Sequence, residues 1–223
     1  MLHTTSNPIL CYVTDRRTLA AGENESAALV EKILAAISAS VDWIQIREKD
    51  LPARVLAGLV EQAVAAARGT PTRILVNDRL DVALAAGAAG VHLGGESLPV
   101  VEVARWCRGV AQPLLAAPKE FLIGASCHSL DEVSAAAEEG ADYVAFGPVF
   151  ETPAKLRFGP PQGIERLAEV CRAVRIPVLA IGGVTLENAP ECLRAGAAGL
   201  AAIRHFQQAS DLPPLVAALR AAR

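Results

Sequence analysis

The hydrophobic pattern along the chain alternates between two kinds of segment. Short apolar runs, typical of buried strands, are each followed by a turn and then by a helix-length stretch rich in Ala, Glu, Leu and Arg. The predicted strands are Pro8–Thr14, Asp42–Arg47, Arg73–Val76, Gly90–Leu93, Leu122–Gly124, Tyr143–Phe146, Val178–Ile181 and Gly199–Ile203. The predicted helices lie near residues 25–39, 53–68, 80–87, 99–108, 130–139, 163–173, 186–195 and 211–222.

These eight strand–helix units in 223 residues predict a single-domain (β/α)₈ TIM barrel. Apolar strands separated by helices pair in parallel through right-handed crossovers. An open doubly wound sheet is the alternative, but it would carry a Gly-rich G-x-G-x-x-G turn after the first strand, and residues 11–16 lack one. We expect one domain over residues 1–223, with a core of about 8–206 and a C-terminal helix at about 211–222.

Composition narrows the class of protein. The hydrophobic fraction is 52%, which excludes a disordered chain, and the net charge of −3 with no polybasic tract argues against nucleic-acid binding. No segment has the length of a membrane span, and the N-terminus does not resemble a signal peptide. The five cysteines show no metal-ligand spacing and are expected to be free thiols. We expect a cytoplasmic protein; the sequence leaves open whether it forms a homodimer.

Candidate chemistry is sought where the strands end, because active sites of this barrel lie at the carboxyl ends of its strands. The second strand is the most informative. Side chains alternate between the two faces of a strand, so Gln45, Arg47 and Lys49 share one side and Ile44 and Ile46 share the other. With the isoleucines packed under the helices, the three polar side chains project into the mouth of the barrel.

Two cations converging in a concave site require an anionic ligand. Arg47 supplies a planar fork for phosphate oxygens and Lys49 supplies a point charge. The alternative is a solvated strand end in which these cations pair with Glu48 and Asp50.

The end of the third strand offers a candidate magnesium site. Asn77 and Asp78 follow three apolar residues, and a carboxylate beside a polyphosphate usually reaches it through Mg²⁺. The alternative is that this pair caps the helix starting near Leu80. Ser97, after the fourth strand, is an N-cap candidate for a helix near Pro99.

The fifth strand leads into a segment with a serine and a histidine that could act on a ligand. Ser126 and His128 alternate onto one side, and His128 could transfer protons near neutral pH. The alternative is that His128 only forms hydrogen bonds. Ser129 and Glu132 have the spacing of a capping box, so we predict that Ser129 caps the next helix.

The last three strands end in loops suited to phosphate. The loop 147–163 is long enough to act as a lid, and its Lys155 would reach a phosphate on closure. Gly182 and Gly183 follow the seventh strand, and Ile203 and Arg204 lie at the end of the eighth. Loops after strands 7 and 8 often bind phosphate through backbone N–H groups.

In order along the chain, several motifs resemble those of the thiamine phosphate synthase superfamily, which also contains the thiazole tautomerase TenI. They cover roughly residues 10–206 and are Gln45-Ile46-Arg47-Glu48-Lys49, Asn77-Asp78, Gly90-Val91-His92-Leu93-Gly94, the run 142–150 and Ile181-Gly182-Gly183. The resemblance implies a transferase that joins hydroxymethylpyrimidine pyrophosphate to thiazole phosphate, with ionisation to a pyrimidine carbocation before attack.

The resemblance also implies roles for single residues. Pyrophosphate would be held by Arg47, Lys49, Ser126 and Lys155. Asp78 would ligate Mg²⁺, with Ser97 at the position of a second ligand. The remaining substrate contacts would be Gln45 and Asn77 with the pyrimidine, Thr152 near the thiazole phosphate, and Gly183 in the cradle of that phosphate. Beside this resemblance, Gly182, Ile203 and Arg204 are further candidates for substrate binding.

Three positions depart from the synthase pattern. Ser97 stands where that pattern has an aspartate, and the neighbouring Glu96 is the nearest carboxylate in sequence. Ala154 replaces the second threonine of the lid motif, and Arg204 replaces a serine. Ser97 and His128 favour the tautomerase, in which a histidine moves the proton, whereas the retained basic set favours the synthase. A regulatory protein that binds a phosphorylated ligand without catalysis is the third hypothesis.

Overall fold

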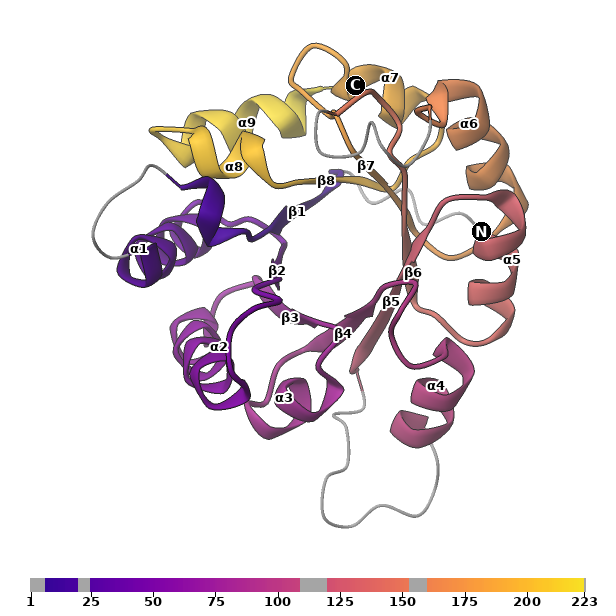
Figure 1. Cartoon of the computed structure of the whole chain (residues 1–223). Coiled ribbons are helices and arrows are strands. Elements are labelled where there is room, and N and C mark those ends of the chain that lie inside the picture. The colour runs from indigo at the N-terminus through magenta and orange to yellow at the C-terminus, as the bar shows by residue number, and fades with distance from the viewer. Residues whose placement is uncertain (1–6, 20–24, 109–119, 153–159, 223) are drawn as a thin grey trace.

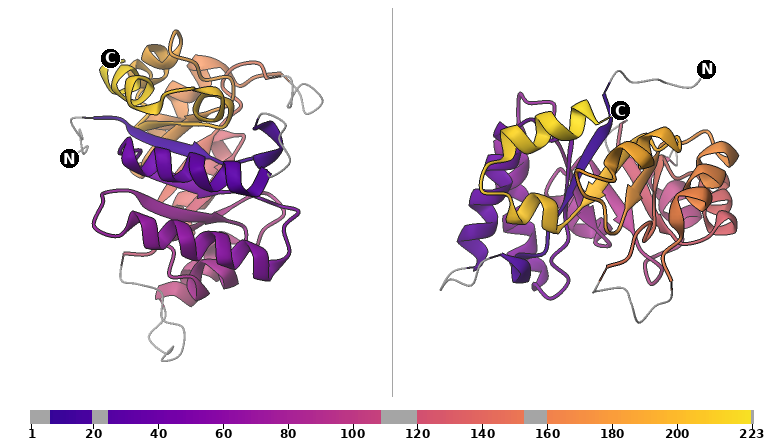
Figure 2. Two further views of the ribbon diagram at one scale, coloured as in Figure 1. Left: turned by 90° about the vertical axis from the view of Figure 1, so that its left-hand side faces the viewer. Right: turned by 90° about the horizontal axis from the view of Figure 1, so that it is seen from above.

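Eight parallel strands close into a barrel that is surrounded by helices (Figure 1). The computed structural model of the chain describes residues 7–19, 25–108, 120–152 and 160–222. Each strand pairs in parallel with the next, and β8 pairs with β1 to complete the ring. The side views show the strands enclosed by the helical layer (Figure 2). The predicted (β/α)₈ TIM barrel is confirmed.

The elements follow the predicted order closely. The strands are β1 (Ile9–Val13), β2 (Trp43–Ile46), β3 (Arg73–Asn77), β4 (Gly90–Leu93), β5 (Leu122–Cys127), β6 (Tyr143–Phe146), β7 (Val178–Ile181) and β8 (Gly199–Ala202). The helices are α1 (Glu25–Ser38), α2 (Ala53–Ala67), α3 (Leu80–Ala85), α4 (Val100–Arg108), α5 (Leu130–Glu138), α6 (Gly163–Ala173), α7 (Ala189–Arg194), α8 (Arg204–Gln208) and α9 (Leu212–Ala221), with a 3₁₀ helix, η1, at Arg16–Thr18.

Two differences from the prediction have physical reasons. β5 continues three residues past its predicted end at Gly124, because its small and polar tail lacks the apolar signal of a buried strand. α8 was not predicted, since five residues are too few to show a helical hydrophobic period.

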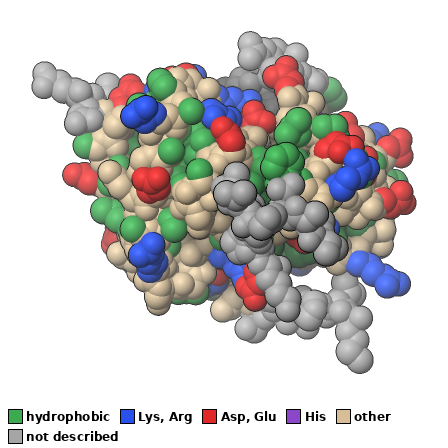
Figure 3. Space-filling model, turned by 90° about the horizontal axis from the view of Figure 1, so that it is seen from below, with side chains coloured by type: hydrophobic (Ala, Val, Ile, Leu, Met, Phe, Trp, Pro, Cys, Tyr) green, Lys and Arg blue, Asp and Glu red, His purple; other side chains and the backbone are tan. Residues whose placement is uncertain are grey.

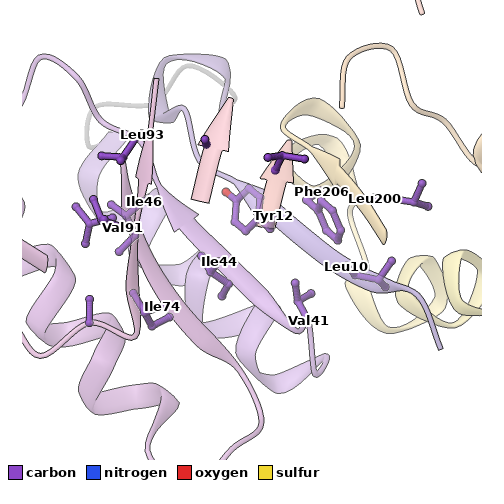
Figure 4. Packing of buried hydrophobic residues seen from close by; sticks show 14 of the residues in the cluster. Leu10, Tyr12, Val41, Ile44, Ile46, Ile74, Val91, Leu93, Leu200 and Phe206 are labelled. Carbon is purple, nitrogen blue, oxygen red and sulfur yellow. The ribbon is translucent and has the colours of Figure 1, made fainter. Parts of the chain in front are cut away.

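The barrel wall has two apolar faces. The outward side chains of the strands pack under the helices, and Ile44, Ile46, Ile74 and Val91 belong to this layer (Figure 4). Tyr12 lies in the same layer beside Phe206 of α8, with ring centroids 5.6 Å apart. A second, smaller set fills the barrel interior and contains Cys11, Val13, Leu75, Tyr143, Leu179 and Ala201.

Polar side chains anchor the end of the barrel where the strands begin. Asp42 accepts a hydrogen bond from the Leu10 N–H at 2.9 Å and pairs with Arg220 of α9. Asp142 accepts from the Ile123 N–H at 2.7 Å and pairs with Arg108 of α4. The residue before β2 and the residue before β6 therefore play the same part, each joining its strand to the preceding one and to a helix.

The surface carries charges of both signs (Figure 3), and the cysteines form no disulfide. On the face shown in Figure 3, basic and acidic side chains are interspersed among apolar ones. All five cysteines are free thiols, as predicted. Among the described residues, no helix combines the length and the apolar character needed to span a bilayer.

Candidate active site

Gln45 lies inside the barrel, as the strand alternation predicts. Its neighbour in the β2–β3 register is Leu75, a member of the interior cluster, and Gln45 itself is only 4% exposed. Its Nε2 donates a hydrogen bond to Oδ1 of Asn77 at 3.0 Å. The structure thus joins two residues predicted to contact the pyrimidine, and the pair forms a polar floor where β2 and β3 end.

Arg47 continues the same alternation towards the mouth. Ile44 and Ile46 are fully buried in the layer under the helices, which places Arg47 on the opposite side of the chain. The charge of Arg47 also helps to lower the pKa of His92, whose side chain lies inside the barrel. Its guanidinium is therefore near the barrel interior, while Lys49 is exposed at the rim.

The ion pairs proposed as the alternative for these cations are absent from the described residues. Glu48 and Asp50 pair instead with Arg16 of η1, at 3.0 and 2.7 Å. Arg47 and Lys49 have no carboxylate partner in the described part of the chain. The predicted pairing is wrong because Arg16, which η1 brings next to this segment, pairs with both acids.

A buried hydrogen-bonded chain leads from the interior to Ser126. Nδ1 of His92 lies 2.9 Å from the Tyr143 hydroxyl, and Nε2 lies 2.8 Å from Oγ of Ser126. Burial, together with the charge of Arg47, lowers the pKa of His92 to about 4, so the ring is neutral at pH 7. In the described chain the phenol O–H has His92 as its partner. We therefore assign Nδ1 as the acceptor, and Nε2–H donates to Ser126.

This assignment determines what Ser126 can offer a ligand. Its oxygen accepts from His92, which leaves the serine O–H free to donate outward. A hydroxyl donor suits an anionic ligand. The residue lies within β5 rather than in a loop above it, because the strand is longer than predicted.

Asp78 occupies an unusual backbone position at the end of β3. Its φ of +68° is in the left-handed region, which Asp tolerates better than most residues. Its N–H donates to the carbonyl of His92 at 2.8 Å, so the turn is fixed to β4. The helix-cap alternative for Asn77 and Asp78 is wrong: Arg79 is the N-cap of α3 and no side chain caps it. The exposed Asp78 carboxylate is therefore available to bind a ligand.

Ser97 does not cap α4, and this alternative is also wrong. The helix begins at Val100, while the Ser97 hydroxyl accepts a hydrogen bond from the Gly94 N–H at 2.7 Å. The serine therefore closes a turn after β4. In the described chain there is no cluster of three or more His, Cys, Asp or Glu side chains suited to a metal. Mg²⁺ needs only one or two protein carboxylates when a substrate supplies phosphate oxygens, and Asp78 fits that mode.

In the segment at the end of β5, one predicted residue caps a helix and another remains a candidate for proton transfer. Ser129 caps α5 by accepting from the Glu132 N–H, as predicted. His128 is exposed, and its Nδ1 donates to the carbonyl of Gly147 at the end of β6. Burial raises the pKa of the neighbouring Cys127 thiol to about 12, so it is not a nucleophile at neutral pH.

Thr152 is the last described residue before residues 153–159, which lie outside the described part of the chain. Its hydroxyl oxygen is buried and has no hydrogen-bond partner in the described chain. A buried hydroxyl without a partner is costly, and a bound ligand would satisfy it. Lys155 lies outside the described residues, so its predicted role stays a prediction.

Gly182 and Gly183 have a packing role in the structure, and their predicted contact with phosphate stays a prediction. Their φ values are +91° and +69°. A Cβ on Gly182 would lie 2.5 Å from Cβ of Pro148, and one on Gly183 would lie 2.7 Å from Cβ of Phe150. The residues that directly follow β6 therefore rest on the turn after β7, where the sequence predicts a phosphate cradle.

The end of β8 carries the last two predicted site residues. Ile203 is the N-cap residue of α8 and packs against the interior cluster. Arg204 is the first residue of α8 and is exposed. Their predicted contact with phosphate stays a prediction.

The sequence interpretation missed the residues that support this site. Thr14 and Arg16 bind Glu48, and Tyr143 binds His92. A polar residue at the end of an apolar strand was the only available signal for Thr14. For Tyr143 there was none, because an aromatic residue in a strand is normally apolar core.

Comparisons with known proteins point to one family. Residues 10–206 match the family model described as thiamine monophosphate synthase. A thiamine-phosphate synthase from a Roseiflexus species is 40% identical over 213 residues, covering 96% of this chain and 84% of the relative. One from Albidiferax ferrireducens is 42% identical over 194 residues, covering 86% and 82%. A solved thiamine phosphate pyrophosphorylase from Pyrococcus furiosus has a TM-score of 0.79 and 33% identity, covering 97% and 96%.

Proposed function

We propose, from the premise that this chain belongs to the thiamine monophosphate synthase family, that the mouth of its barrel binds a diphosphate-bearing pyrimidine and a thiazole phosphate. The chain is a thiamine-phosphate synthase and hence a transferase, a conclusion that rests on relatives with about 40% identity over most of its length. The finer assignment of roles below is the proposal.

The observation that carries the proposal is a pair of cations that follow β2 in the chain. Arg47 and Lys49 have no ion-pair partner in the described residues, whereas Glu48 and Asp50 beside them both pair with Arg16. Negative charge builds on a diphosphate as its bond to carbon breaks. Cations already in place stabilise that charge without reorganisation, and this lowers the barrier to departure.

Other side chains complete the diphosphate site. The Ser126 O–H donates to a phosphate oxygen, since His92 occupies the serine's acceptor. Asp78 would hold Mg²⁺, which supplies further positive charge to the leaving group when bound. Ser97 brings no carboxylate and already accepts from the Gly94 N–H, so we assign it a weaker part in the metal site.

The remaining contacts orient the two reacting molecules. Gln45 and Asn77 present amide groups that can hydrogen-bond the pyrimidine ring. Thr152, with its unpaired hydroxyl, and the turn at Gly182 and Gly183 are the candidates for the thiazole phosphate. Lys155, Ile203 and Arg204 retain their predicted contacts in the proposal. With both substrates held, the thiazole nitrogen attacks the pyrimidine methylene carbon as pyrophosphate leaves.

The test is formation of thiamine phosphate and release of pyrophosphate from both substrates with Mg²⁺. Arg47→Gln should lower kcat by about 10²–10³-fold, the usual effect of losing one preorganised group at developing charge. Arg105→Gln removes an exposed arginine of α4 that pairs with Glu102, and it should leave the rate unchanged. Equal effects of the two variants would refute the role of Arg47.

The tautomerase hypothesis has its own outcome in a parallel assay. Interconversion of thiazole carboxylate phosphate tautomers, abolished in His128→Ala and without pyrophosphate release, would replace the synthase assignment. Binding of thiazole phosphate with no turnover in either assay would favour the regulatory hypothesis.

The free thiols of all five cysteines also support our placement of the protein in the cytoplasm.

A further inference from the structure

Glu48 lies between Arg47 and Lys49 in sequence, but its side chain is directed towards Thr14 and Arg16. It lies beyond the end of β2, directly after Arg47, and its side chain is 1% exposed. A buried carboxylate is costly unless charged or polar partners surround it. Glu48 has such partners, and all of them come from the end of β1 and the start of η1.

Thr14 connects Glu48 to the backbone of the site. Its hydroxyl donates to Oε1 of Glu48 at 2.6 Å, and its own Oγ1 accepts a hydrogen bond from the Arg47 N–H at 2.9 Å. Thr14 itself is fully buried, and its N–H donates to the Gln45 carbonyl at 2.9 Å. The Thr14 hydroxyl thus continues the hydrogen bonding between β1 and β2 beyond the last strand residue. It fixes the backbone N–H of Arg47 and so the direction in which the Arg47 side chain leaves the backbone.

Arg16 completes the arrangement from the other side. Its backbone N–H donates to both oxygens of Glu48 at 3.2 Å, and its Nη1 donates to Oε2 at 3.0 Å. The same guanidinium holds Asp50 through two hydrogen bonds of 2.7 Å. Both acids that neighbour the cations in sequence are thereby bonded to Arg16 rather than to Arg47 or Lys49.

We propose that Glu48 is a positioning residue, which acts through Thr14 and Arg16 to hold Arg47 and Lys49 free and aimed at a diphosphate ligand. This inference rests on the proposed function, because it assumes that the two cations bind diphosphate. Glu48 touches neither the substrates nor the reacting atoms. Its contribution is to fix the peptide of Arg47 and to keep nearby carboxylates out of the mouth.

The charge of Glu48 gives the proposal a sharp test. A negative group close to an anion site weakens anion binding by simple electrostatics. If only its charge mattered, Glu48→Gln would therefore bind inorganic pyrophosphate more tightly than the wild-type protein. A positioning role predicts the opposite sign. We expect pyrophosphate binding, measured by titration calorimetry, to weaken about tenfold, as for loss of one hydrogen bond to a charged group. Tighter or unchanged binding would overturn the proposal.

Threonine variants test the path through which Glu48 acts. Thr14→Val removes the shared hydroxyl and should also weaken pyrophosphate binding about tenfold, with a higher KM for the pyrimidine substrate and an unchanged KM for the thiazole phosphate. Thr14→Ser retains the hydroxyl and should restore binding. The matched control is Thr72→Val, which removes another buried hydroxyl that donates to the Val41 carbonyl at the opposite end of the barrel. It should leave pyrophosphate binding unchanged.

A double variant separates positioning from general damage to the fold. In an Arg47→Met background, Thr14→Val should no longer weaken pyrophosphate binding, because the group that it positions is gone. An undiminished effect in that background would show a structural role and overturn the inference. Failure of the proposed function looks different: the wild-type protein would then bind no pyrophosphate, or Arg47→Met would bind it as tightly as the wild type.

Discussion

Gly124→Ala is expected to destabilise the barrel strongly, because Gly124 lies against the ring of Tyr143. A Cβ at this position would come closer than 3.0 Å to Cζ, Cε1 and the hydroxyl of Tyr143. The ring cannot move away easily. It is 1% exposed, its other neighbour Trp43 lies with its ring centroid 4.6 Å away, and its hydroxyl is bound to His92.

The magnitude follows from two costs. Forcing an extra methyl group into a packed core costs about 1–3 kcal/mol. Pulling the phenol away from His92 leaves buried polar groups unpaired, at about 1–3 kcal/mol more. We expect a loss of about 4 kcal/mol in the free energy of unfolding. For a chain of this size the melting temperature should fall by roughly 8–16 °C, at about 2–4 °C per kcal/mol.

Urea unfolding followed by circular dichroism measures the effect. Gly58→Ala is the control, since Gly58 lies within α2 with nothing within 4 Å of its added Cβ. That change should stabilise the protein by about 0.8–1 kcal/mol through helix propensity. In a Tyr143→Leu background the clashing ring atoms are gone, so Gly124→Ala should cost at least about 2 kcal/mol less there. An equal cost in both backgrounds would refute the clash as the cause.

Three other outcomes follow from single contacts. Burial and the charge of Arg47 lower the pKa of His92 to about 4 in the folded state, so between pH 6.5 and about 4 the unfolded chain binds the proton more readily than the folded one. The free energy of unfolding should therefore fall as the pH falls through this range, by about 3 kcal/mol more in the wild type than in His92→Gln. Urea unfolding at each pH measures the difference. Ser129→Ala should cost about 1 kcal/mol in thermal unfolding because α5 loses its N-cap, and a value near zero would contradict the cap. Arg220→Met should lower stability by about 1 kcal/mol by breaking the bond to Asp42, with kcat/KM unchanged, since this contact lies at the end of the barrel away from the mouth.

Much of the fold and part of the site are readable from local pattern. Strand alternation placed Ile44 and Ile46 under the helices and Gln45 inside the barrel, and the serine–glutamate spacing gave the cap of α5. Alternation works because neighbouring side chains of a strand must face opposite sides, whatever the rest of the chain does. The same rule put Arg47 near the barrel interior.

Local pattern could not predict the ion pairs, because residues distant in sequence compete for the same carboxylates. Glu48 and Asp50 are the nearest acids to Arg47 and Lys49 along the chain, and sequence distance alone favoured pairing them. Arg16, more than thirty residues earlier, takes both acids because β1 and β2 lie side by side.

The sequence by itself determined the eight-unit barrel and the chemical character of its rim, because apolar periodicity and motif order are properties of the chain. Only the tertiary structure decided which charges stay unpaired. The net interaction of a cation depends on every group that folding brings within a few ångströms, and closure of the barrel brings Arg16 to Glu48 and His92 to Ser126.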